Sequence, residues 1–78
     1  MTKTEYKRCE ELMYEGIRYA ESAVKSIKKS EKETNEIDKT VLLTRGFQDF
    51  GYAQGIEQAL VCMGFKHEEM KKLSKLTW

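Results

Sequence analysis

Few side chains in this 78-residue sequence are of the types that do chemistry. The two cysteines, Cys9 and Cys62, lie far apart and in no Cys-x-x-Cys motif, and His67 is the only histidine. Structural and catalytic metal sites and catalytic triads need several such groups together, so three distant segments would have to converge here. We therefore expect no catalytic residue, no metal and no cofactor. We expect two buried thiols and a solvent-exposed His67, and leave open whether a disulfide joins the cysteines.

Carboxylates are numerous, but most of them alternate with lysines on what would be solvated helix faces, as Glu10, Glu11 and Glu15 do. Asp49 and Glu57 stand out because they flank the glycines in the second half of the chain. Acid–base catalysis by paired carboxylates requires a cleft, and the sequence pattern does not predict one. The sequence therefore favours a protein that is not an enzyme.

The charge balance argues against a strongly basic nucleic-acid module. Lys and Arg total 14 and Asp and Glu total 13, which gives a net charge of +1. Lysines gather near residues 25–32 and 66–75, but acidic residues lie among them, so no region has the basic excess that phosphate binding favours. Nucleic-acid binding through these lysine-rich helix ends is the alternative function, and nucleic acid is not the favoured partner.

The composition is that of a globular protein, with 40% hydrophobic and 35% charged residues. The sequence has no run of 18 apolar residues that could span a membrane, and its first residues lack the apolar core of a signal peptide. Small secreted domains are usually rich in disulfides, and this chain has two cysteines only. We therefore expect a cytoplasmic protein that does not enter membranes.

The first half of the chain predicts one long amphipathic helix over about residues 2–30. Helix-forming residues dominate and proline is absent. Apolar or small residues recur at alternating spacings of three and four, as in a helix that packs along one seam. The seam comprises Tyr6, Cys9, Met13, Gly16, Ala20, Ala23 and Ile27, and Leu12, Ile17, Tyr19 and Val24 widen it. A polar connection is expected at about 31–35.

A second helix is predicted over about residues 36–63, with Asn35 or Thr34 as its N-cap. The apolar sides of its two halves differ by roughly 110° in helical projection, with Gly51 at the junction. Either the helix breaks or kinks near Gly51, or it is continuous and carries two apolar stripes. One stripe would face the first helix and comprises Leu42, Gly46, Ala53, Ile56, Leu60 and Met63. A short β-strand at Thr40–Thr44 is a less favoured interpretation.

A third, short helix is predicted over about residues 67–76, with Met70 and Leu73 facing inward. Gly64 is placed to end the second helix in a left-handed conformation, followed by the apolar Phe65. Trp78 is expected to pack on another surface. The predicted fold is all-α: a single domain over residues 1–78, formed by a long antiparallel helical hairpin with a short C-terminal third helix.

The remaining apolar residues predict an interface. A chain of this size has a limited core, and small folds often add oligomerisation. We expect a homodimer that forms a four-helix-type bundle, or the same hairpin docked on a larger protein. The predicted interface comprises the second stripe and one tyrosine of the first helix: Leu43, Phe47, Phe50, Gln54, Val61 and Tyr14. A polar patch of Arg45, Gln48 and Asp49 lies beside it.

These features together predict a small non-enzymatic protein-interaction module that regulates, links or inhibits a partner protein through apolar helix faces. The short, Lys- and Glu-rich helical sequence without enzymatic motifs is similar in general character to accessory proteins of phages and mobile elements. This likeness implies binding to host or defence proteins, and it does not rest on any particular motif.

Overall fold

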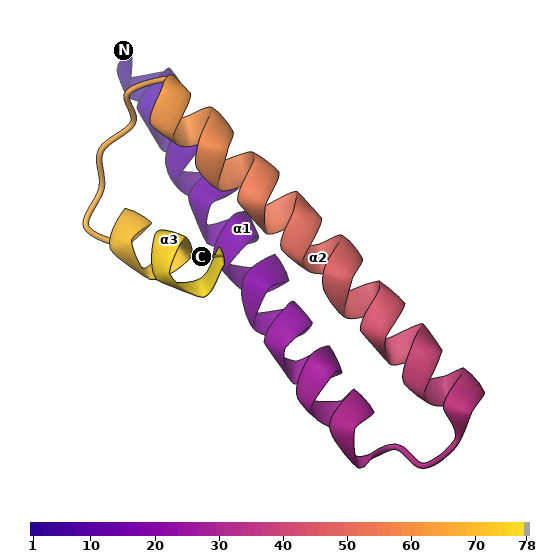
Figure 1. The fold of residues 1–78 in the computed structure, drawn as a ribbon. Coiled ribbons are helices and arrows are strands. Elements are labelled where there is room, and N and C mark those ends of the chain that lie inside the picture. The colour runs from indigo at the N-terminus through magenta and orange to yellow at the C-terminus, as the bar shows by residue number, and fades with distance from the viewer. Residues whose placement is uncertain (78) are drawn as a thin grey trace.

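The computed structural model describes residues 1–77 and contains three α-helices and no strand within that range. They are α1 (Lys3–Lys32), α2 (Glu36–Cys62) and α3 (Met70–Thr77). The helices α1 and α2 form an antiparallel hairpin, and α3 packs across one side of it (Figure 1). The all-helical prediction is confirmed, whereas a strand at Thr40–Thr44 is excluded because these residues lie within α2. The expected packing of Trp78 lies outside the described residues.

Local capping sets the start of both long helices. The Thr2 hydroxyl accepts a hydrogen bond from the Glu5 backbone N–H at 3.1 Å, and the Glu5 carboxylate accepts one from the Thr2 N–H at 3.4 Å. This reciprocal pair is a capping box. At α2, the side-chain oxygen of Asn35 accepts hydrogen bonds from the backbone of Ile37 and Asp38, as expected for the predicted N-cap. The connection between the helices is therefore short, at residues 33–35.

The second helix ends at a glycine. Gly64 has φ +75°, its N–H donates to the Val61 carbonyl, and the Phe65 N–H donates to the Leu60 carbonyl. This pattern is a Schellman motif, and its usual apolar contact is present because Phe65 and Leu60 share the core. The predicted role of Gly64 is confirmed. The turn directs residues 65–69 back along the hairpin, so that α3 begins at Met70 rather than near residue 67.

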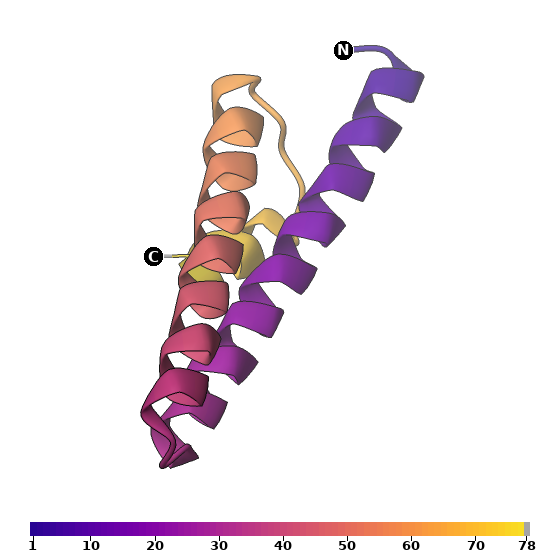
Figure 2. The ribbon, with the colours of Figure 1, turned by 90° about the vertical axis from the view of Figure 1, so that its right-hand side faces the viewer.

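The α2 helix is uninterrupted through Gly51, which excludes the break and favours the interpretation with two apolar stripes. Along the stripe predicted to face α1, Gly46, Ala53 and Leu60 are buried. Met63 is an exception, since it is 55% exposed. It is the C-cap of α2, at the end where the two long helices diverge (Figure 2).

Side-chain size explains this divergence. Near the connection, small residues allow close contact, and a Cβ added at Gly46 would lie 2.8 Å from Cγ1 of Ile27. Toward the other end, large side chains and α3 fill the space between the helices. This core comprises Cys9, Met13, Ile17, Leu60, Phe65, Met70 and Leu73. Most of the seam predicted for α1 is buried, so the core of the hairpin follows the sequence pattern.

Candidate interaction surfaces

The predicted second stripe of α2 lies on the side of the hairpin where α3 packs. Gln54 is half-buried, and its side-chain N–H donates to the Thr77 carbonyl at 3.0 Å. Leu43 and Phe50 are also half-buried, whereas Phe47 is 63% exposed. The short α3 therefore covers this side only in part.

A hollow of about 420 Å³ lies between α2 and the end of α3, beside Phe47. Gly51 lies in its lining, and a Cβ added there would meet no atom within 4 Å. We call this area the Phe47 surface, and it comprises Leu43, Phe47, Phe50, Gly51 and Leu76. The hollow is open and its lining is mixed, since Gln54, Lys75 and Thr77 also contribute to it. An open surface with an exposed aromatic side chain and one open glycine suits contact with another helix better than chemistry.

The other two predicted interface residues lie apart from this surface. Val61 is 56% exposed and lines a separate hollow with Phe65, His67 and Met70. Tyr14 lies on α1, where its ring meets the edge of the His67 ring at a centroid distance of 6.0 Å. The predicted interface residues therefore lie at separate places around α3 and do not form one patch.

The polar residues beside the stripe also separate. Asp49 accepts a hydrogen bond from the Ser22 hydroxyl at 3.1 Å, which ties α2 to α1. Arg45 and Gln48 line a shallow hollow along α2 itself, with Thr40, Val41 and Thr44. Asp49 therefore has a structural contact within the hairpin, while Arg45 and Gln48 are exposed.

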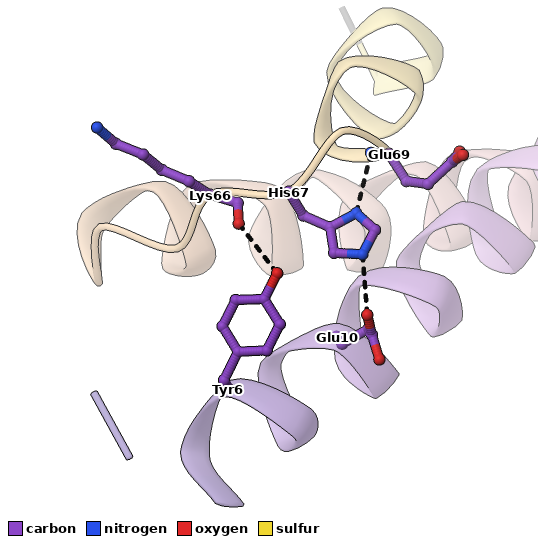
Figure 3. Close-up of polar contacts among 5 residues, drawn as sticks. All are labelled: Tyr6, Glu10, Lys66, His67 and Glu69. Atoms are coloured by element: carbon purple, nitrogen blue, oxygen red, sulfur yellow. Dashed lines mark hydrogen bonds and ion pairs between the residues drawn. The ribbon is translucent and has the colours of Figure 1, made fainter. Parts of the chain in front are cut away.

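Sequence reasoning placed His67 wrongly. Its side chain is only 13% exposed, and its Nε2 lies 2.9 Å from Oε2 of Glu10 (Figure 3). Its Nδ1 accepts the backbone N–H of Glu69 at 3.0 Å. Since Nδ1 accepts, the neutral ring carries its proton on Nε2 and donates to Glu10. The prediction of solvent exposure failed because Glu10 lies 57 positions away in the sequence, where no local pattern indicates it.

Aromatic rings surround this imidazole. Phe65 and Tyr6 stack near it at centroid distances of 5.9 Å and 6.4 Å. The Tyr6 hydroxyl donates to the Lys66 carbonyl at 3.4 Å (Figure 3). Partial burial and then the carboxylates of Glu10, Glu69 and Glu68 raise the pKa of Tyr14. The contacts of Tyr6 and Glu10 with Lys66 and His67 hold the 65–69 segment against α1.

The cysteines do not pair. Cys9 is buried in the core and Cys62 is exposed, so both thiols are free and the expectation of two buried thiols is wrong for Cys62. Among residues 1–77, no group of three or more His, Cys, Asp or Glu side chains is arranged to hold a metal ion. In the same range, no helix is long and apolar enough to cross a membrane.

A further apolar area lies on the opposite side of the hairpin and was not predicted as an interface. Leu12 is 36% exposed, Tyr52 is 62% exposed, and Tyr19 packs on Tyr52 at a centroid distance of 5.4 Å. Tyr52 is two residues before Gln54, so it points roughly 200° away from the side that contacts α3. We call this area the outer face, and it comprises Leu12, Tyr19, Tyr52, Gly55, Ala59 and Met63. The sequence pattern indicates Leu12 and Tyr19 only as residues that widen the apolar seam of α1.

Comparisons with models of known protein families, with curated proteins and with solved structures give no match to this chain.

Proposed function

We propose that this chain is a small non-enzymatic protein-interaction module that regulates, links or inhibits a partner protein. The observation that carries the proposal is the Phe47 surface, where a phenylalanine is 63% exposed beside an open hollow. Exposed large aromatic side chains with apolar neighbours are typical anchors of protein interfaces. The two free thiols fit a reducing compartment, and we place the action of the protein in the cytoplasm.

The partner that fits best is an amphipathic helix. The helix α3 packs on this side of the hairpin toward its wide end, and Leu43, Phe47 and Phe50 continue the same side of α2 toward the connection. A partner helix that lies beyond the end of α3, on the same side of the hairpin, would cover these residues as α3 covers the rest of that side. Helix-in-groove recognition of this kind uses anchors at i, i+3, i+4 and i+7.

Gly51 supports this occupant. A glycine inside a helix costs roughly 0.5–1 kcal/mol relative to alanine, and no contact within residues 1–77 requires its small size. A partner backbone that approaches α2 closely at this point would require it. Gly46, by contrast, is explained by its contact with Ile27 inside the hairpin.

Panning a displayed library of helical peptides on the immobilised chain tests the proposal. We expect enrichment of amphipathic peptides, with binding lost in a Phe47→Ser chain. Binding should persist in an Ile37→Ser chain, because Ile37 is 75% exposed at the far end of α2 and serves as the matched control. A failure to enrich peptides, or enriched peptides that bind the Phe47→Ser chain equally well, would overturn the proposal.

A further inference from the structure

We propose that the outer face, which the proposed function does not use, pairs two copies of this chain in a two-fold antiparallel contact centred on Leu12 and Ala59. The occupant is a second copy, with α1 of one copy lying along α1 of the other. The contact leaves both Phe47 surfaces free, since they lie on the side where α3 packs. The result is a dimer with two partner sites.

The elongated shape, 50 × 16 × 16 Å, leaves the chain with more exposed surface than a compact monomer of the same 9.1 kDa mass. Its accessible surface is 5788 Å², against about 4,900 Å² for the compact form.

The charges along α1 point to a second copy rather than to an unrelated protein. Arg8 precedes Leu12 by about 6 Å along the helix axis and Glu15 follows it by about 4.5 Å. Rotation about a two-fold axis near Leu12 therefore brings Arg8 opposite Glu15 of the second copy, and the pair occurs twice. A two-fold contact between identical copies requires a surface that is complementary to itself, whereas a contact with a different protein does not.

Neither Arg8 nor Glu15 forms an ion pair with another side chain within the described part of the chain. These charges are thus available for a contact between copies.

The shape of α2 agrees with the same axis. Gly16 meets Ile56 and Tyr19 meets Tyr52 across the hairpin, which places Leu12 about level with Ala59. Gly55 and Met63 lie four positions before and after Ala59, so the rotation brings each Met63 opposite Gly55 of the second copy. Met63 is 55% exposed, and a Cβ added at Gly55 would meet no atom within 4 Å. A bulky side chain therefore faces an open glycine.

Sedimentation velocity over a dilution series tests this contact. We expect a wild-type mass of about twice 9.1 kDa at high concentration. Arg8→Glu or Glu15→Arg alone places like charges opposite one another twice and should raise the dissociation constant at least about tenfold. The double variant Arg8→Glu with Glu15→Arg should restore association, Leu12→Glu should abolish it, and circular dichroism should show unchanged helicity.

The Phe47→Ser chain is the control, and it should remain a dimer although it loses peptide binding. Three results would overturn the inference: a wild-type mass of 9.1 kDa at every concentration, a double variant that stays dissociated, or a dimer that Phe47→Ser dissociates and Leu12→Glu does not. Because the peptide test depends on Phe47 and this test on Leu12, the failure of either proposal is distinguishable from that of the other.

Discussion

One imidazole ties the 65–69 segment to α1 and fixes its local turn, because His67 bonds to Glu10 of α1 and to the backbone N–H of Glu69 just before α3. We predict that His67→Ala lowers the free energy of unfolding by about 1–2 kcal/mol, since two hydrogen bonds of a largely buried side chain are lost. Urea denaturation of the variant beside the wild type measures this. Glu68→Ala, at an exposed neighbouring position, should change the value little. Equal values for His67→Ala and wild type would mean that the ring does not hold the segment.

The raised pKa of Tyr14 predicts a pH dependence on the alkaline side only. Its folded pKa lies above the unfolded value of about 10. The contribution of Tyr14 to the free energy of unfolding is therefore fully present below about pH 10 and is lost as pH rises through the folded pKa. The difference in phenolate absorbance between wild type and Tyr14→Phe should isolate the ionisation of Tyr14, and this step should lie above pH 10. A step at a lower pH would contradict the raised pKa.

Residue-scale features of this kind lie beyond the sequence pattern. The capping roles of Asn35 and Gly64 could be predicted because their partners are two to five positions away. The contact between His67 and Glu10 could not, because it depends on how the 65–69 segment returns along α1.

Among the elements, α2 carries the clearest stability prediction, because its glycines differ in surroundings. Gly46→Ala should lower the free energy of unfolding by about 1 kcal/mol, since the new methyl group overlaps the Ile27 side chain. Gly51→Ala should raise it by about 0.5–1 kcal/mol, since open space surrounds the site. Chemical denaturation of both variants at one protein concentration checks this, and the same sign for both would contradict the packing described.

The third helix should be an integral part of the core. Leu73 is completely buried, so Leu73→Ala is predicted to cost about 2–5 kcal/mol in the free energy of unfolding. Thermal or urea unfolding measures the loss, for which the exposed Lys72→Ala is a matched control on the same helix. A cost similar to that of the control would mean that α3 does not pack on the hairpin.

The element scale also shows why one helix was easier to predict than the other. The apolar seam of α1 packs on α2 and, toward its start, also on Leu73 of α3, and one broad apolar arc covers both contacts. In α2, Ala53 and Leu60 face α1 while Gln54 bonds to α3. Two neighbours in different directions mix two periodicities, which produced the apparent rotation at Gly51 without any break in the helix.

At the scale of the whole molecule, three helices make an elongated body of 50 × 16 × 16 Å. An eight-residue α3 covers only part of one side of a hairpin built from 30- and 27-residue helices. Both areas assigned to binding follow from this imbalance: the Phe47 surface next to α3, and the outer face opposite it. The sequence could predict spare apolar surface, but not its division between two sides, because that depends on where α3 packs.

The central claim is that Phe47 serves binding and not the fold, and the free energy of unfolding of Phe47→Ser tests it most directly. Phenylalanine and serine have similar helix propensities, and the side chain is 63% exposed, so we predict a change within about 0.5 kcal/mol of wild type. A loss as large as that of Leu73→Ala would contradict the claim, because Phe47 would then belong to the core and would not be free to bind a partner.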